Sequence, residues 1–257
     1  MSRGIIGYTG FVGGNLCEQM KFDHFYNSKN INDIRGMEFD ELFISGVSAV
    51  KWLANKEPEK DLSNIDSLIA NLREVKAKRV ILISTVDVYP SPINVDESTL
   101  IDINECQPYG KHRLYFEGFV ENNFSHVHIL RLPGLFGNGL KKNIIFDFIN
   151  KNMVDSIESR NFFQFYCLNT LSKDIELAKK NNIKLLNVSV EALSVKEVAE
   201  CCGIPGFDNV INKPLVRYDF KSIYSKHWES GKLGYLYNKA DCLSMLRDFV
   251  AGVDRNV

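Results

Sequence analysis

The sequence predicts an α/β protein whose core is a parallel sheet covered by helices on both faces. Short apolar runs alternate with helix-like segments through the first half of the 257-residue chain. Buried parallel strands are continuously apolar because helices cover both of their faces. A glycine-rich turn at residues 7–13 also joins the first apolar run to the first helix. Together these observations predict a Rossmann-like, doubly wound sheet followed by a small C-terminal lobe.

The individual elements follow from local patterns in chain order. Apolar or β-branched runs predict strands at 4–6, 23–26, 41–46, 79–84 and 126–132. The segments between them predict helices at 11–20, 63–76 and 109–122. Further along the chain we expect helices at 141–151, 170–181 and 239–250, and strands at 162–166 and 184–188. Ser194 and Glu197 have the spacing of a capping box, which predicts a helix from there to Cys202.

This order of elements predicts two domains. We expect a dinucleotide-binding domain over residues 1–190, with a substrate-lobe insertion near 135–170. A small C-terminal substrate lobe is expected over residues 191–257.

Composition and charge exclude several classes of protein. The chain is 45% hydrophobic and 25% charged, which is typical of a globular protein. Its formal net charge of −1 lacks the basic excess of a nucleic-acid binder. No apolar run approaches the roughly 20 residues that cross a bilayer, so we expect no membrane partner. The six cysteines form no CxxC pair, which predicts a cytoplasmic protein with reduced thiols. His126 and His128 have no third ligand at a suitable spacing, so no metal site is expected.

The glycine-rich turn predicts a dinucleotide site. Gly7 permits a tight turn, Gly10 lets the backbone approach a pyrophosphate, and Gly13 lets the helix pack on the strand. The amides of a helix N-terminus favour phosphate. We expect cofactor contacts from this turn, whose other members are Thr9, Phe11 and Val12.

The second strand is expected to carry the residue that binds the adenosine ribose. About 20 residues beyond the first glycine stand Asn27, Ser28 and Lys29, with no carboxylate among them. A serine and a lysine suit a 2′-phosphate, which favours NADP slightly over NAD. Lys29 as an ordinary solvated loop residue is an equally good interpretation.

Hydroxyl groups and a cation predict the reaction chemistry. Ser84 and Thr85 end the strongest predicted strand, where ligands collect in open α/β sheets. Tyr109 and Arg113 are four residues apart on a predicted helix, hence on one face. A neighbouring cation favours the phenolate of a tyrosine that acts as a base. This set predicts hydride transfer at a carbinol carbon, with Tyr109 as acid–base group.

The sequence resembles the extended short-chain dehydrogenase/reductases, the NAD-dependent epimerase/dehydratase group. Five segments carry the resemblance: 7–13, 84–89, 108–114, 130–137 and 193–199. The resemblance implies NAD or NADP, a nucleotide-sugar substrate and a Ser/Thr–Tyr–Lys catalytic set. Members often form dimers through two helices, which leaves a homodimer open for this chain.

Position by position, the resemblance implies a role for several residues. Thr85 matches the catalytic threonine and Tyr109 the catalytic tyrosine, while Arg113 stands in the place of the catalytic lysine. Thr85, Tyr109 and Asp87 are the expected substrate contacts. The expected cofactor contacts beyond the turn and the ribose loop are Gly46, Val47, Ser48, Ser84, Tyr109, Arg113, Leu132 and Pro133.

Two functions remain open at this point. The first is an NAD(P)-dependent reductase or epimerase of a nucleotide sugar; a dehydratase is disfavoured because Val86 replaces the acid that such enzymes carry after the threonine. The second is a non-catalytic dinucleotide-binding sensor or assembly protein of a sugar pathway. Arg113 and the short C-terminal lobe favour the second, and the joint presence of Thr85 and Tyr109 favours the first.

Overall fold

The computed structural model describes residues 2–253, and these pack into two compact units. Within the described range, the first unit comprises residues 2–91, 99–131 and 170–186, and the second comprises 92–98, 132–169 and 187–253. The predicted division into a dinucleotide-binding domain and a substrate lobe at residue 190 stays a prediction.

A six-stranded sheet forms the centre of the first unit, in the order β2-β1-β3-β4-β5-β9. Its strands are β1 (Arg3–Ile6), β2 (His24–Tyr26), β3 (Glu38–Ile44), β4 (Lys76–Thr85), β5 (Val127–Leu132) and β9 (Leu185–Asn187). Strand β1 pairs in parallel with β2 and β3, and β3 pairs in parallel with β4. The chain moves outward from β1 to β2 and then places later strands on the other side of β1. The predicted doubly wound α/β fold is therefore confirmed.

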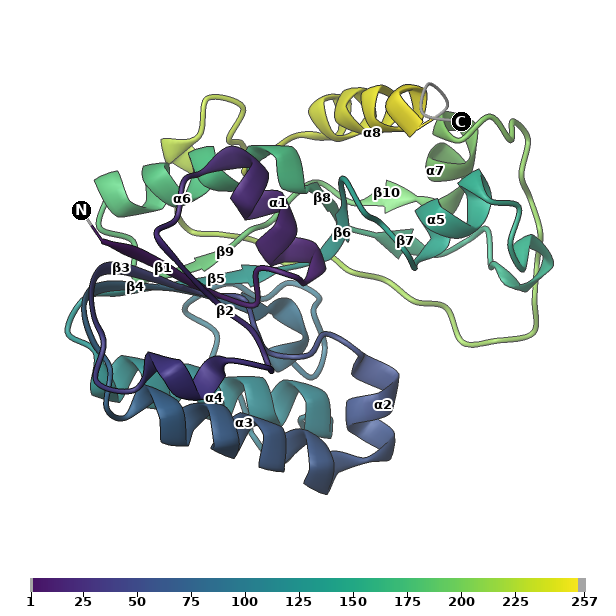
Figure 1. The fold of residues 1–257 in the computed structure, drawn as a ribbon. Helices are drawn as coiled ribbons and strands as arrows, with labels where there is room; N and C mark the ends of the chain where they lie inside the picture. Colours follow the sequence, from purple (N-terminus) through teal and green to yellow (C-terminus); the bar gives the residue numbers. More distant parts are fainter. Residues whose placement is uncertain (1, 254–257) are drawn as a thin grey trace. The chain divides into compact units, whose positions relative to one another are not determined.

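Helices cover both faces of this sheet (Figure 1). Helices α1 (Phe11–Gln19) and α6 (Leu171–Lys180) lie on one face, and α3 (Pro58–Leu72) and α4 (Pro108–Asn123) lie on the other. An apolar cluster lies under α3 and α4, with Leu42, Ile44, Leu82, Ile69 and Phe116 among its buried side chains. Burial on both faces explains why these strands read as continuous apolar runs.

Element boundaries differ from the prediction mainly around β3. Helix α3 begins at Pro58 rather than at residue 63, because proline suits the first helical position. Strand β3 begins at Glu38 rather than at residue 41, in register with the longer β4. A short helix that the pattern did not predict, α2 (Lys51–Lys56), follows the loop after β3.

The second unit contains short strands and three helices. Strand β6 (Gly134–Phe136) pairs in parallel with β8 (Phe165–Cys167), and β7 (Phe162–Phe163) pairs antiparallel with β10 (Leu193–Ser194). The helices are α5 (Ile144–Ile149), α7 (Val195–Cys201) and α8 (Lys239–Val253). The capping box predicted at Ser194 and Glu197 is confirmed at the start of α7.

The single strand predicted over 162–166 is wrong, because the segment is split at Gln164 between two sheets. The buried Gln164 amide donates to the carbonyls of Val190 and Phe220 and accepts the Phe220 N–H. A buried amide must have hydrogen-bond partners. Gln164 finds them at Val190 and Phe220, so it does not continue the strand.

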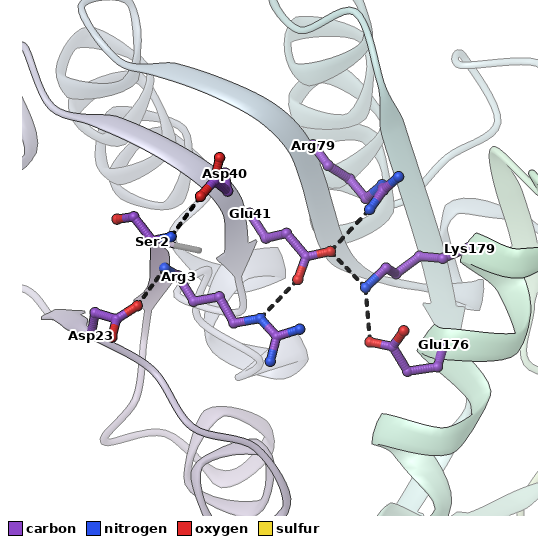
Figure 2. A network of polar contacts seen from close by, with 8 residues as sticks. All are labelled: Ser2, Arg3, Asp23, Asp40, Glu41, Arg79, Glu176 and Lys179. Carbon is purple, nitrogen blue, oxygen red and sulfur yellow. Dashed lines mark hydrogen bonds and ion pairs between the residues drawn. The ribbon is translucent and has the colours of Figure 1, made fainter.

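A buried carboxylate joins three elements of the first unit. Glu41 of β3 is 1% exposed, and it contacts Arg3 Nε at 2.8 Å, Arg79 Nη1 at 3.1 Å and Lys179 Nζ at 2.6 Å. These cations come from β1, β4 and α6, and they converge on Glu41 in Figure 2. Burial raises the pKa of Glu41, but the hydrogen bonds from the cations outweigh burial and lower it below the ordinary value. Glu41 is therefore an ionised link between the sheet and α6.

The described part of the chain has neither a membrane-spanning helix nor a cluster of metal-binding side chains. No helix within residues 2–253 has the length and apolar character to cross a membrane. Over the same residues, no three His, Cys, Asp or Glu side chains converge as a metal-ligand set. The ring of His128 instead contacts the Ile183 carbonyl at 2.6 Å, and burial lowers its pKa.

Candidate functional site

The glycine-rich turn lies between β1 and α1, and its three glycines have different surroundings. Gly7 has φ of +88°, and a Cβ there would lie 2.5 Å from Gly46 Cα. A Cβ at Gly13 would lie 2.1 Å from the Gly7 carbonyl oxygen. At Gly10, φ is −82° and a Cβ would meet only the Gly7 oxygen, at 3.2 Å. Gly7 and Gly13 are thus needed for packing, whereas Gly10 leaves open space on the exposed side of the turn.

Helix α1 begins at this turn without a capping side chain. Gly10 occupies the N-cap position, and the first turn contains no acidic residue. The first amides of a helix have no intrahelical partner and form its positive end. Thr9 and Gly10 are exposed, and Phe11 and Val12 are half-buried beside them. This end of α1 has the chemistry to hold a diphosphate.

The loop after β2 has its own hydrogen-bond pattern. The Asn27 side chain donates to the Tyr8 hydroxyl at 3.2 Å and accepts the Lys29 N–H at 2.9 Å. Ser28 and Lys29 are exposed. The Asn27 amide is therefore used to shape the loop, while the Ser28 hydroxyl and the Lys29 ammonium face solvent.

The loop after β3 lies next to the glycine turn. Gly46 contacts Gly7 across the sheet edge, and both Gly46 and Ser48 are exposed with Val47 half-buried between them. The carboxyl ends of β1 and β3 meet here, where the strand order reverses. Ligands of open α/β sheets bind at such a switch point.

Thr85 and Tyr109 lie together at the end of β4. The Thr85 hydroxyl accepts the Asp87 N–H at 3.1 Å, which begins the 3-10 turn Val86–Val88. Thr85 lies near the buried phenol of Tyr109, which is 7% exposed, and its side chain lowers the pKa of that phenol. A Cβ at Gly110 would lie 2.0 Å from the Asp87 carbonyl oxygen, so only glycine lets α4 approach this turn. The sequence motif contained Gly110, but its role in close packing was visible only in the structure.

Burial controls the ionisation of Tyr109. It raises the pKa of the phenol, and the nearby Asp87 carboxylate raises it further. Arg113, the hydrogen bond from Thr85 and Lys51 each lower the pKa, but they do not outweigh burial. Arg113 lowers the pKa of Tyr109 in the predicted direction, but by less than burial raises it.

Arg113 lies beside Tyr109 as predicted, but most of its hydrogen-bonding capacity is used within the protein. Its guanidinium carbon is 4.0 Å from the centre of the Tyr109 ring. The guanidinium forms a bidentate pair with Asp61, at 2.5 Å and 2.9 Å, and donates to the carbonyls of Ser48 and Tyr109 at 2.5 Å and 3.2 Å. His112 contacts the same Asp61 carboxylate at 2.7 Å. Burial raises the pKa of Asp61, and the hydrogen bonds from Arg113 and His112 lower it to a value below the ordinary one.

The hydroxyl of Ser84 is directed away from the predicted ligand edge, toward α4. It donates to Glu117, whose carboxylate pairs with Arg131 at 2.6 Å. Arg131 in turn donates to the Tyr89 hydroxyl at 2.9 Å. This buried network positions the end of β4, and the Ser84 side chain belongs to it.

Two predicted contacts fall in the second unit. Leu132 is buried at the end of β5, and half-buried Pro133 follows it. Both stay predicted cofactor contacts.

Three pairings that shape the site have no signal in the sequence. Asp61 pairs with Arg113, and Lys51 Nζ lies 2.8 Å from Asp87 Oδ1. Asn55 Oδ1 accepts the N–H of Tyr109 at 2.9 Å. Their partners lie 36 to 54 residues away in the chain, and no local pattern marks such pairs.

Comparison with known proteins identifies the fold. No family model matches the sequence, and no curated protein matches it. Among solved structures, UDP-glucose 4-epimerase of Thermotoga maritima with UDP-glucose is 13% identical, with a TM-score of 0.72 over 100% of this chain and 99% of that chain. MoeE5 in complex with UDP-glucuronic acid and NAD is 15% identical, with a TM-score of 0.73 over 100% of both chains. The dTDP-4-dehydrorhamnose reductase of Clostridium acetobutylicum is 14% identical, with a TM-score of 0.68 over 99% of this chain and 100% of that chain.

The chain therefore has the fold of the extended short-chain dehydrogenase/reductases, as its sequence predicted. At these identities the likeness establishes the fold and leaves the activity to be argued from the site.

Proposed function

We propose that this protein is an NAD(P)-dependent reductase or epimerase that acts on a nucleotide-activated sugar by hydride transfer. The observation that carries the proposal is the placement of Thr85 at the end of β4 beside Tyr109, where Gly110 packs against the Asp87 carbonyl of the turn that follows. Structures of the same fold hold UDP-glucose, or UDP-glucuronic acid with NAD, which supports this class of substrate and cofactor.

The residues at the edge of the sheet fit a dinucleotide. The open side of Gly10 and the uncapped start of α1 suit its diphosphate. In this proposal Asn27, Ser28 and Lys29 face the adenosine ribose, and a 2′-phosphate there would favour NADP over NAD. The nicotinamide end is assigned to Gly46, Val47, Ser48, Leu132 and Pro133, with Tyr109 and Arg113 on α4. A bound dinucleotide supplies a hydride acceptor or donor.

Tyr109 is the proposed acid–base group. As a sugar carbinol is oxidised, the Tyr109 oxygen takes the hydroxyl proton in its phenolate form and becomes the phenol, and Thr85 orients the same sugar oxygen. In the reverse direction Tyr109 returns the proton to the carbonyl oxygen. A single transfer gives a reduction, whereas oxidation followed by return of hydride to the other face gives epimerisation. Asp87, next to Thr85, is a further proposed substrate contact.

The test replaces Tyr109 by phenylalanine and measures turnover with NAD or NADP and with UDP-glucose, UDP-glucuronic acid and a dTDP-4-keto sugar. Loss of an acid–base group lowers turnover by about 10²- to 10⁴-fold. Tyr115→Phe is the matched control, because Tyr115 lies on the same helix and is 46% exposed. Equal turnover by Tyr109→Phe and wild type would show that the chemistry lies elsewhere.

A non-catalytic dinucleotide-binding function is the second candidate, and the pairing of Arg113 with Asp61 favours it. A guanidinium held in a buried bidentate pair is poorly placed to contact a ligand as well. This function predicts that a dinucleotide and a sugar nucleotide raise the melting temperature without turnover. Measurable turnover of any of the sugars above removes this candidate.

We also propose that a homodimer forms through the exposed side of α4. A shallow depression of about 420 Å³ lies there, lined by Arg73, Leu114, Tyr115, Gly118, Phe119, Asn122 and Asn123. Light scattering of the full chain measures the oligomeric state.

A further inference from the structure

The ionisation of Tyr109 depends on charges from four elements. Arg113 of α4 lies over the face of its ring, and Asp61 of α3 neutralises that guanidinium together with the contact from His112. On the Thr85 side of the phenol, Asp87 lies in the turn after β4 and Lys51 lies on α2. These five groups are the titratable and charged residues that the structure places around the phenol.

Lys51 differs from Arg113 in how it is held. The Lys51 side chain is 44% exposed and pairs with Asp87, which is 20% exposed, at 2.8 Å. Arg113 is 5% exposed in a bidentate pair. An exposed lysine on a flexible stem re-orients easily, whereas a buried guanidinium fork does not.

Helix α2 is itself attached to the helix that carries Tyr109. Asn55, at its other end, accepts the N–H of Tyr109 at 2.9 Å. That amide lies in the first turn of α4, where no intrahelical acceptor exists. The backbone of α2 is therefore held beside Tyr109, which keeps Lys51 within reach of Asp87.

We infer that Lys51 is a positioning residue of this site. Its ammonium holds the Asp87 carboxylate in place at the turn that begins at Thr85, and it offsets the negative charge that Asp87 places near Tyr109. The inference rests on the proposed function for the role of Tyr109 as acid–base group. The Asp87 amide donates to Thr85, and a Cβ at Gly110, the residue after Tyr109, would lie 2.0 Å from the Asp87 carbonyl oxygen. The turn that carries the ion pair therefore packs directly against the first turn of α4, which carries Tyr109. Arg113, compensated by Asp61, then serves mainly to hold α3, α4 and the loop after β3 together.

This inference predicts opposite effects for the two members of the pair. Removing the Lys51 charge takes away a cation that favours the phenolate, so the pKa of Tyr109 rises. Removing the Asp87 charge takes away an anion that disfavours the phenolate, so the pKa of Tyr109 falls. A variant that merely loosened the site would not reverse the sign.

The experiment places a fluorinated tyrosine at position 109 of the full chain and follows its single fluorine resonance with pH. The fluorinated phenol ionises at lower pH than tyrosine, which counteracts the upward shift that burial gives the pKa of Tyr109. We expect Lys51→Met to move the midpoint upward by about one pH unit, as for loss of a nearby opposite charge. Lys51→Arg keeps the wild-type midpoint, and Asp87→Asn moves the midpoint downward.

Lys56→Met is the matched control, because Lys56 is also an exposed lysine and lies at the far end of α2. We expect this variant to leave the midpoint unchanged. The inference is overturned if Lys51→Met leaves the midpoint in place, or if Lys51→Met and Asp87→Asn move it in the same direction. The titration needs no substrate, so its result is independent of whether any sugar is turned over. Absence of turnover with a normal response to Lys51→Met would count against the proposed function alone.

Discussion

Replacing Arg113 by lysine is the most direct test of what this residue does. The change keeps one positive charge at the same position on α4, and it restores the residue type that the resemblance places there. In the structure, however, Arg113 donates to both oxygens of Asp61 and to the carbonyls of Ser48 and Tyr109. A lysine ammonium is a compact charge and cannot reproduce this planar fork.

The expected loss follows from these contacts. Lysine keeps one contact to the Asp61 carboxylate and loses the second, together with the two carbonyl contacts. A hydrogen bond to a charged group contributes about 1.5–3 kcal/mol. Losses at neighbouring contacts of one side chain are not additive, so we expect Arg113→Lys to destabilise the fold by about 2–3 kcal/mol, near the value for a single such bond. Arg113→Met leaves a buried carboxylate with only His112 beside it, and its expected cost is about 3–5 kcal/mol. For a chain of this size the lysine variant would melt about 4–12 °C lower.

Calorimetry of the ligand-free protein measures this loss, and a double-mutant cycle assigns it. Asp61→Asn combined with Arg113→Met is expected to cost less than the sum of the single changes, because the two side chains contact each other. Lys111→Met is the control, since Lys111 is exposed on the same helix. Wild-type stability in Arg113→Lys would refute the reasoning, because it would show that the guanidinium fork is not required.

Three further outcomes are expected. The pKa of Glu41 is lowered in the folded state, so its contribution to stability is complete above about pH 4.5 and is lost as the pH falls through the folded value. Glu41→Gln should therefore cost about 3 kcal/mol at neutral pH and flatten the acid limb of a denaturation series, whereas an unchanged acid limb would exclude this carboxylate as its source. Gly10→Val adds a side chain only on the open side of the turn, so it should keep the melting temperature and weaken NAD binding in calorimetry at least about tenfold. Gly14→Ala, with its Cβ 3.8 Å from the nearest atom, is the control, and equal affinity in both variants would remove the diphosphate site from this turn. Lys29→Ala tests the ribose loop: it should lower NADP affinity more than NAD affinity, and an equal change in both would mark Lys29 as a solvated residue.

Features that depend on neighbours in the chain were predictable from sequence. The strand–turn–helix at Gly7, Gly10 and Gly13 was predicted with the function of each glycine, and the structure places Gly7 and Gly13 in packing contacts that exclude a side chain. The capping box at Ser194 and Glu197 was likewise predicted. The placement of Tyr109 and Arg113 on one helix face followed from their spacing of four residues.

Predictions failed where tertiary packing competes with local preference. The aromatic run around Gln164 has the composition of one strand. The buried amide of Gln164, however, donates to the Val190 carbonyl and accepts the Phe220 N–H, and the run is split at this residue. The Ser84 hydroxyl donates to Glu117 of α4, a partner that no local pattern indicated, while its cofactor contact stays a prediction. In both cases a buried polar group found its partner across the fold, and that partner determined its orientation.

The sequence by itself determined the fold class and the turn that suits a diphosphate, because periodicity, capping and turn chemistry act over a few residues. The pairing of Thr85 with Tyr109 was implied by the resemblance alone. Only the tertiary structure decided which charges act on Tyr109. Asp61 pairs with Arg113 from 52 residues away, and Lys51 pairs with Asp87 from 36 residues away. Such pairs form when the helices pack on the sheet, because an ion pair depends on the distance between two charges in space. It does not depend on a fixed number of residues between them.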